Sequence, residues 1–133
     1  MDHNKKLGHF SESLAADYLR SHGLIVIARN YRNYLGEIDI IAIKPMNFLH
    51  KLTKKILPTS KIIFVEVKAQ SGSRFGLAEE RIGHFKQEKL KQLAVAFLKE
   101  KNLSNSWRID AIRVDLSVNP PIIKHIESAV ESN

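Results

Sequence analysis

The sequence predicts an α/β domain in which a mixed β-sheet carries helices on both faces. Two observations indicate this class. Apolar residues recur at helical spacing at 7–22 and again from about 78 to 101. Runs rich in β-branched and aromatic residues lie between and after these segments, at 36–43, 61–68 and 107–115. With a short apolar strand at 24–28 and a last one at 122–126, the predicted element order is α-β-β-β-α-β-β.

One domain accounts for all 133 residues, because this length can bury a substantial core and no linker or repeat interrupts it. The chain has no cysteine, which excludes disulfides, iron–sulfur clusters and cysteine-based zinc sites. Its start is polar, and no apolar run approaches the ~20 residues that a membrane span needs. We therefore expect a cytoplasmic protein without a membrane span.

The formal net charge is +7. Such a surplus attracts polyanions, nucleic acid first and anionic membranes second. A soluble basic protein without such a partner has the same composition, so charge alone does not decide between these classes. The placement of the acidic residues carries more information.

Two of the predicted strands carry acids in their interiors, where burying a charged side chain costs free energy. With a period of two, Glu66 and Lys68 project from the same face of one strand, and Glu37 and Asp39 share a face of the other. If these strands pair, Asp39 and Glu66 come within reach of one metal ion. Carboxylate oxygens suit Mg²⁺ and Mn²⁺, and a nearby ammonium can hold a water or stabilise phosphate charge. The combination predicts phosphodiester cleavage.

The first predicted helix brings a further acid near this place. Gly23 is positioned to end the helix, and Glu12 falls beside Leu19 on a helical wheel, at the border of the buried face. An acid at that border can point along the sheet toward a site. A solvated glutamate satisfies the same pattern.

The segment 29–34 is predicted to be a turn that leads into the Asp39 strand. Its Arg29 and Arg32 are suited to phosphate contacts, although an ordinary polar hairpin loop has a similar composition. The strand at 107–115 alternates cleanly, but its buried face is ambiguous: either Ile109 and Ala111 or Ile112 and Val114 point inward. Residues 127–133 are predicted to be a polar tail.

A long connection joins two strands at 44–60. It contains an apolar stripe bordered by lysines, which predicts a short basic amphipathic helix; the stripe consists of Phe48, Leu49, Leu52 and Ile56. Long connections are usually functional or mobile. This one could follow DNA, contact a protein or membrane partner, or be a surface flap, and the sequence leaves these alternatives open.

Several short motifs occur in a fixed order along the chain. They are Arg29-Asn30-Tyr31-Arg32, Gly36-Glu37-Ile38-Asp39, Phe64-Val65-Glu66-Val67-Lys68, Arg74-Phe75-Gly76 and Arg108-Ile109-Asp110. Together they resemble the YraN family, small bacterial proteins similar to archaeal Holliday junction resolvases. An Asp followed on the next strand by Glu-x-Lys resembles the signature of restriction-endonuclease-like nucleases. The resemblance covers roughly residues 8–126.

The resemblance implies a restriction-endonuclease-like fold and roles for particular residues. Asp39 and Glu66 would hold Mg²⁺ or Mn²⁺, Lys68 would position a water, and Glu12 would be an outer or second-metal ligand. Arg29, Arg32, Arg74 and Lys86 would contact DNA. Asp110 matches a family acid, but we interpret it as a structural pairing because two ligands already satisfy the metal.

The residues and the resemblance together predict a metal-dependent DNA endonuclease, with branched DNA as a candidate substrate. Resolvases act as dimers, so a homodimer is implied by resemblance alone. The main alternative is a non-catalytic nucleic-acid-binding protein of the same fold. A third is a basic scaffold subunit that uses the connection at 44–60.

Overall fold

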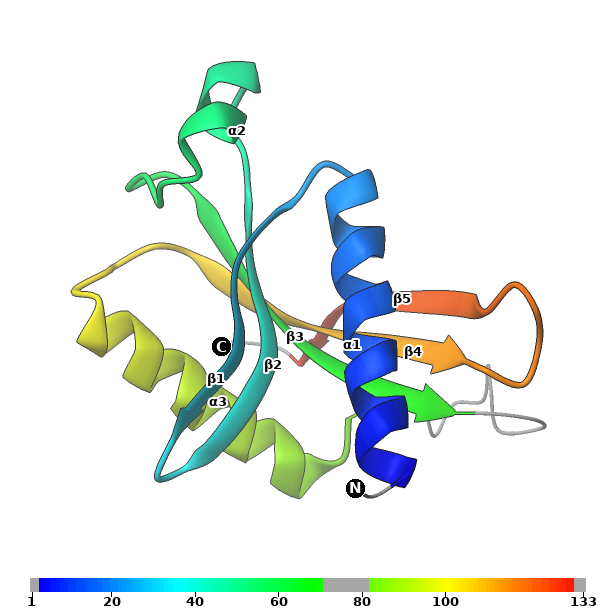
Figure 1. Cartoon of the computed structure of the whole chain (residues 1–133). Helices are drawn as coiled ribbons and strands as arrows, with labels where there is room; N and C mark the ends of the chain where they lie inside the picture. Colours follow the sequence, from blue (N-terminus) through cyan, green and yellow to red (C-terminus); the bar gives the residue numbers. More distant parts are fainter. Residues whose placement is uncertain (1–2, 71–81, 131–133) are drawn as a thin grey trace.

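The computed structural model describes residues 3–70 and 82–130. Its elements are α1 (His3–Ser21), β1 (Ile25–Asn33), β2 (Gly36–Lys44), α2 (Phe48–Thr53), β3 (Lys61–Gln70), α3 (His84–Glu100), β4 (Trp107–Asp115) and β5 (Ile122–Val130). The five strands form one sheet in the order β1-β2-β3-β4-β5 (Figure 1). None of the described helices is long and apolar enough to cross a membrane.

The sheet is mixed, as predicted. β3 and β4 are parallel, and every other neighbouring pair is antiparallel. Parallel neighbours need a crossover, and the chain makes it through α3. The predicted α/β class and mixed sheet are confirmed, and α2 is the short helix predicted inside the connection, although it ends at Thr53, before Ile56.

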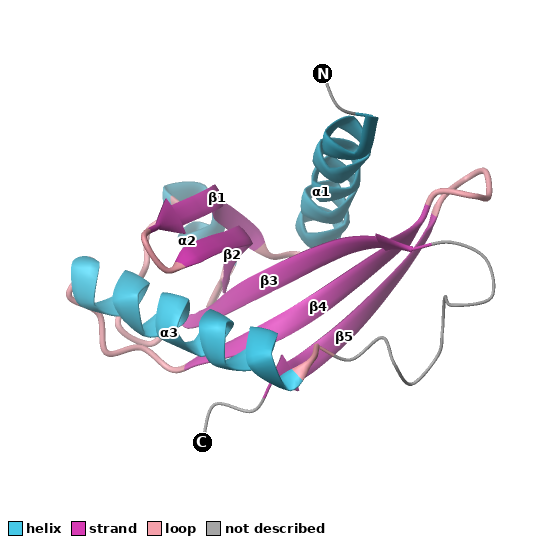
Figure 2. Ribbon diagram, turned by 90° about the horizontal axis from the view of Figure 1, so that it is seen from below, coloured by secondary structure: helices cyan, strands magenta, loops and turns pink. Residues whose placement is uncertain are grey.

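The two long helices cover opposite faces of the sheet (Figure 2). The α1 face buries Ala15, Ala16, Leu19, Ile40, Ile63, Val65, Ile112 and Val114. The α3 face includes Phe64, whose ring packs edge-to-face on Phe97 at a centroid distance of 5.8 Å. β4 is therefore buried on both sides, which resolves its ambiguous phase: Ile109 and Ala111 face α3, while Ile112 and Val114 face α1.

Helix α1 ends as its glycine predicts. Gly23 has a φ of +88°, a left-handed conformation that favours glycine. The N–H of Leu24 donates to the carbonyl of Leu19 at 3.0 Å, so the chain turns sharply from the helix into β1. This turn brings β1 beside β2 with α1 lying across the sheet.

The predicted turn at 29–34 is wrong. These residues continue β1 to Asn33, which pairs with Gly36, so the hairpin loop is only Tyr34 and Leu35. Gly36 has a φ of +143°, and the N–H of Leu35 donates to Asn33 Oδ1 at 2.7 Å. Glycine and asparagine thus close a two-residue turn, and Arg29 and Arg32 lie on a strand.

Two further boundaries differ from the prediction. β5 continues past the expected end at 126, because Val130 pairs with Ile109 across a bulge in the β4–β5 ladder. The expected polar tail is therefore wrong for residues 127–130. α3 begins at His84, and its predicted start near 78 lies outside the described residues.

Strands β2 and β3 separate in the middle of the sheet. Their paired register runs from Lys44 opposite Lys61 to Ile40 opposite Val65 and ends there. Beyond that pair the two ribbons diverge visibly (Figure 1). Asp39 is the next residue of β2 after this pairing ends, so its side chain lies at the fork between the strands.

Candidate functional site

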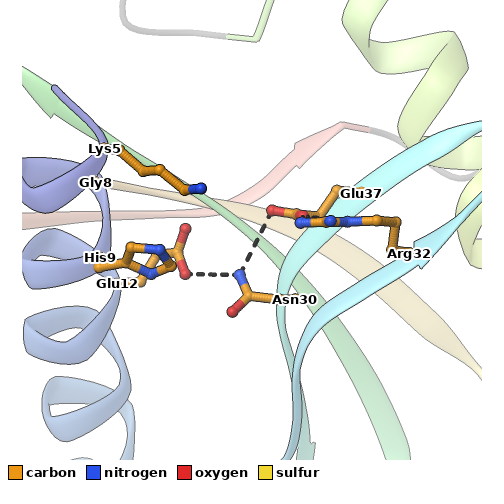
Figure 3. A pocket seen from close by; sticks show the side chains of 7 residues that line it. All are labelled: Lys5, Gly8, His9, Glu12, Asn30, Arg32 and Glu37. Atoms are coloured by element: carbon orange, nitrogen blue, oxygen red, sulfur yellow. Dashed lines mark hydrogen bonds and ion pairs between the residues drawn. The ribbon is translucent and has the colours of Figure 1, made fainter. Parts of the chain in front are cut away.

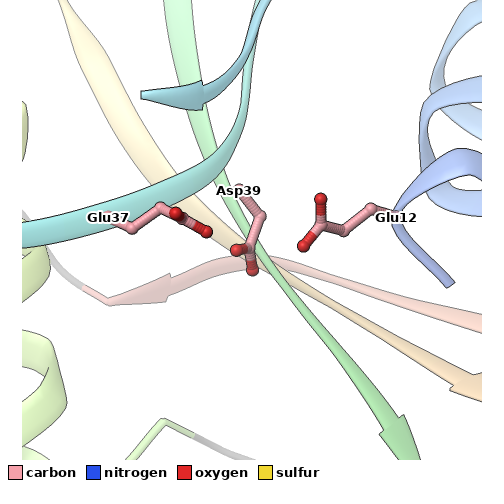
Figure 4. A group of neighbouring side chains, drawn as sticks. All are labelled: Glu12, Glu37 and Asp39. Atoms are coloured by element: carbon pink, nitrogen blue, oxygen red, sulfur yellow. The ribbon is translucent and has the colours of Figure 1, made fainter. Parts of the chain in front are cut away.

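Three carboxylates gather at the fork between β2 and β3. Glu12 reaches in from α1, and Glu37 and Asp39 come from β2, with one carboxylate oxygen of each within 4.8 Å of the others (Figure 4). Glu37 and Asp39 are two positions apart on a strand, so alternation predicts that they project together. All three side chains are half-buried. We call Glu12, Glu37 and Asp39 the acidic cluster.

Asp39 is the most perturbed member of the acidic cluster. Burial raises its pKa to about 7 from 3.8, and the charges of Glu12, Glu66 and Glu37 add to the rise. A hydrogen bond from the N–H of Val67 to Asp39 Oδ2, 2.8 Å long, acts in the opposite direction. Asp39 therefore keeps its proton to a much higher pH than an ordinary aspartate does.

Glu66 lies on β3, beyond the fork from Asp39. It is not a member of the acidic cluster, but its charge is one cause of the raised Asp39 pKa. Burial also raises the pKa of Glu66, and the charges of Lys86, Arg113 and Lys68 partly offset the rise. Lys86 Nζ lies 3.9 Å from Glu66 Oε1, while the buried Oε2 has no hydrogen-bond partner among the described residues.

Lys68 follows Glu66 on β3 and is exposed. It borders a hollow of ≈ 440 Å³ between the start of α1 and the end of β3. The lining residues are Leu7, Gly8, Val67, Lys68, Ala69, Gln70 and Leu116. The ammonium group therefore belongs to a solvent-open surface near Glu66.

Asn30 and Arg32 of β1 form hydrogen bonds with two members of the acidic cluster, Glu12 and Glu37 (Figure 3). Asn30 Nδ2 donates to Glu12 Oε1 at 2.8 Å and to Glu37 Oε1 at 3.5 Å. Arg32 Nε donates to Glu37 Oε2 at 2.9 Å, and Arg32 and Glu37 form an ion pair. Two of the three carboxylates are thus already paired by donors of this chain.

Asn30 was not predicted as a site residue. Its φ of +54° lies in the left-handed region, which asparagine tolerates better than most residues, and this backbone aims the amide between two acids. The signal that could have found it is its place between Arg29 and Arg32 in a motif already noted. Sequence alternation alone does not reveal a left-handed residue within a strand.

A second hollow opens beside the acidic cluster (Figure 3). Its volume is ≈ 260 Å³, and it is lined by Lys5, Gly8, His9, Glu12, Asn30, Arg32 and Glu37. Acidic and basic side chains thus face the same space. A phosphate group entering here would meet basic side chains on either side of the carboxylates.

The other predicted DNA contacts are placed as follows. Arg29 is exposed on β1 and donates to Ser13 Oγ at 3.2 Å. Lys86 is half-exposed at the start of α3, beside Glu66. Arg74 lies outside the described residues.

Asp110 is a structural residue, as predicted. It is fully buried, and its carboxylate accepts hydrogen bonds from Arg108 Nε at 2.9 Å, His125 Nε2 at 2.7 Å and the N–H of Ser128 at 2.9 Å. Burial alone would raise the pKa of Asp110, but these partners hold it below its ordinary value. The carboxylate therefore ties β4 to β5, and it is not part of the acidic cluster.

Comparisons with known proteins agree on one family. A family model described as "Uncharacterised protein family UPF0102" matches residues 11–114, which include Glu12, Asp39, Glu66 and Lys68. The chain is 39% identical over 116 residues to a UPF0102 protein of Clostridium botulinum (strain Loch Maree / Type A3), covering 86% of this chain and 83% of the relative. It is 35% identical over 130 residues to a UPF0102 protein of Geobacter metallireducens, covering 97% and 95%.

Proposed function

The chain belongs to the UPF0102 family, as its resemblance to the YraN family predicted, and we propose that it is a metal-dependent DNA endonuclease. The observation that carries the proposal is the acidic cluster at the fork of β2 and β3, with Glu66 and Lys68 on the adjoining strand. Buried carboxylates gathered in this way repel one another, and a shared cation relieves that repulsion.

The residues fit a hard divalent cation. The available ligand atoms are carboxylate oxygens, which Mg²⁺ and Mn²⁺ prefer over softer donors. Asp39 is stabilised in its protonated form near neutral pH, so a cation would take the place of that proton. Glu66 Oε2 is buried without a hydrogen-bond partner among the described residues, which leaves it available as a ligand. We assign the metal to Asp39 and Glu66, with Glu12 as an outer or second ligand.

Groups of the chain that lie near the proposed metal ligands would each contribute to hydrolysis. A bound divalent ion supplies Lewis acidity, which polarises a phosphate and lowers the pKa of a water. The Val67 N–H fixes the orientation of Asp39 through their hydrogen bond. Lys68, exposed beside Glu66, positions the attacking water or stabilises charge on the phosphate.

DNA is the proposed substrate because the net charge of +7 favours a polyanion. Arg29 is exposed and can contact phosphates, and Lys86 is half-exposed but forms an ion pair with Glu66. Arg32 is paired with Glu37, so it would contact DNA only after exchanging that partner. Branched DNA and a homodimer are extensions of the proposal that rest on the resemblance to resolvases.

The test is incubation of the purified protein with end-labelled linear, flapped and four-way DNA in Mg²⁺, Mn²⁺ or EDTA. We expect cleavage products only with the metals, and none from the Glu66→Gln variant. Asp17→Asn is the matched control, since it removes one exposed acidic charge that belongs neither to the acidic cluster nor to the proposed metal ligands. Salt-dependent binding of all three DNAs without cleavage under any metal condition would replace the nuclease with a nucleic-acid-binding module.

A further inference from the structure

Helix α2 buries a histidine and exposes its three apolar residues. Phe48, Leu49 and Leu52 are 73%, 69% and 66% exposed, while His50 is only 4% exposed. An amphipathic helix on a globular protein normally does the reverse. Met46, just before the helix, is exposed as well. The tip of the predicted connection therefore presents an apolar surface that residues 3–70 and 82–130 leave uncovered, and we call it the α2 tip.

The buried histidine holds the α2 tip in this orientation. His50 Nδ1 accepts from the N–H of Met46 at 2.9 Å, and its Nε2–H donates to the carbonyl of Lys55 at 2.6 Å. Asn47 Oδ1 caps the helix by accepting from the N–H of His50 at 2.8 Å. One imidazole thus connects the segments before and after the helix, and the apolar side chains point outward as a result.

The base of the connection is also bonded to the domain. Asn105, which is buried, donates through Nδ2 to the carbonyls of Leu57 and Ser60 at 2.7 and 2.8 Å. Ile56 packs against the core on the α3 face. The connection is therefore attached to the domain at its base. The exposed apolar residues lie at its tip and take no part in that attachment.

The connection is strongly basic. The sequence from 40 to 65 contains no acidic residue and five lysines, which are Lys44, Lys51, Lys54, Lys55 and Lys61. Lys44 and Lys61 lie directly opposite each other on β2 and β3, a like-charge arrangement that destabilises a sheet. Within the described part of the chain none of these lysines has an ion-pair partner. An anionic partner would offset this repulsion.

A hollow beside α2 combines both properties. It has a volume of ≈ 240 Å³ and is lined by Arg20, Lys51 and Lys54 together with Leu24, Ile25 and Val26. Basic side chains beside an apolar floor suit a phosphate that is attached to an apolar chain. α2 itself projects beyond the end of the sheet, away from α3 (Figure 1).

We propose that the α2 tip docks the protein on an anionic lipid bilayer. Protruding apolar side chains can enter the interface, while the surrounding lysines meet the lipid phosphates. Duplex DNA would satisfy the lysines but offers nothing to Phe48, Leu49 and Leu52. A second copy of the chain would bring five more lysines against the first five. This docking surface is separate from the acidic cluster and does not depend on nuclease activity.

The test is co-sedimentation of the full chain with vesicles of phosphatidylcholine alone or with one third phosphatidylglycerol. Binding is expected only to the anionic vesicles. A lysine near such a surface contributes about 1 kcal/mol, so Lys51→Gln/Lys54→Gln should weaken binding roughly thirty-fold. The matched control Lys99→Gln/Lys101→Gln removes the same charge from the exposed end of α3 and should bind like the wild type.

A second variant separates apolar insertion from charge. Phe48→Ser/Leu49→Ser/Leu52→Ser leaves the net charge unchanged and alters only exposed side chains, so the fold should persist and vesicle binding should fall at least about tenfold. Equal losses in the two lysine variants would overturn the proposal in favour of general charge attraction. The proposal would also be overturned if the triple serine variant still bound anionic vesicles. The same holds if that variant lost only self-association or DNA binding.

Discussion

The carboxylate of Asp39 accepts a 2.8 Å hydrogen bond from the backbone N–H of Val67, at the fork where β2 leaves β3. The bond replaces a sheet contact that the divergence removes. It also places Asp39 beside the residue that separates Glu66 from Lys68. A short side-chain contact therefore connects the two strands that carry the proposed chemistry.

The Asp39→Asn variant should reduce a loss of stability that the wild type shows as pH rises. The folded Asp39 has a pKa of about 7 because of burial and its acidic neighbours, against 3.8 for the ordinary group. Between these values the folded state binds more protons than the unfolded state, so stability falls as pH rises from about 4 to 7. Above pH 7 the raised pKa of Asp39 lowers the free energy of unfolding by up to about 4 kcal/mol.

The measurement is urea denaturation in EDTA at pH 5.5 and 8. Wild type should be less stable at pH 8, and Asp39→Asn should reduce that difference because the amide keeps an acceptor for Val67 but carries no charge. Asp17→Asn, an exposed acid on α1, is the control and should retain the wild-type slope. An Asp39→Asn protein with an unchanged slope would contradict the assignment of the effect to this residue.

Asp39→Asn and Lys68→Ala should separate metal binding from chemistry. The asparagine removes one ligand charge, so metal affinity and cleavage should fall together. The alanine removes an exposed ammonium outside the proposed ligand set, so metal binding should persist while the cleavage rate falls by about 10²–10⁴. Calorimetry with Mn²⁺ and single-turnover cleavage measure the two quantities. If both variants change only DNA affinity, in step with their charge, the protein is a binding module.

Asp110→Ala should destabilise the fold without contacting the acidic cluster. The change leaves the N–H of Ser128 and the side chains of Arg108 and His125 without their buried acceptor. Removing one partner of such a network costs about 3–5 kcal/mol. Because the folded pKa of Asp110 is low, its contribution is present above about pH 4 and is lost as pH falls further.

Chemical denaturation at pH 7 checks the size of the Asp110 effect. The control Asp17→Ala removes an exposed acid and should change stability by no more than about 0.5 kcal/mol. If Asp110→Ala hardly changes the free energy of unfolding but abolishes cleavage, Asp110 belongs to the functional site and not to the scaffold.

Replacement of residues 46–59 by Asn-Gly should leave the domain folded. Lys44 and Lys61 are already paired at the ends of β2 and β3, so a four-residue loop can close the hairpin. The removed segment exposes most of its apolar side chains, but it also contains Ile56, which packs on the core, and the Leu57 carbonyl that accepts from Asn105. Its loss should therefore cost about 1–2 kcal/mol. Thermal unfolding followed by circular dichroism measures this. Leu93→Ala, a core change expected to cost about 2–5 kcal/mol, is the positive control.

Local sequence patterns were sufficient to predict the fold class, the family and most of the acids of the candidate site. Periods of 3.6 and 2 are local properties, so helical spacing indicated α1 and α3, and alternation put Glu37 and Asp39 on one face. Gly23 was identified as a helix end because its backbone freedom is intrinsic to the residue. Asp110 was assigned to structure and Asp39 to the site without coordinates.

The grouping of these acids depends on how strands and helices distant in the chain are placed relative to one another. Sequence alternation paired Asp39 with Glu66, but the divergence of β2 from β3 places Glu12 and Glu37 around Asp39, while Glu66 lies beside Lys86. The left-handed Asn30 likewise depends on a distant partner, Glu12, whereas the outward apolar face of α2 depends on the burial of His50 between Met46 and Lys55. The propensity of a residue influences its local conformation. Strand divergence and burial depend instead on partners that are distant in the chain, and a local sequence pattern carries no information about those partners.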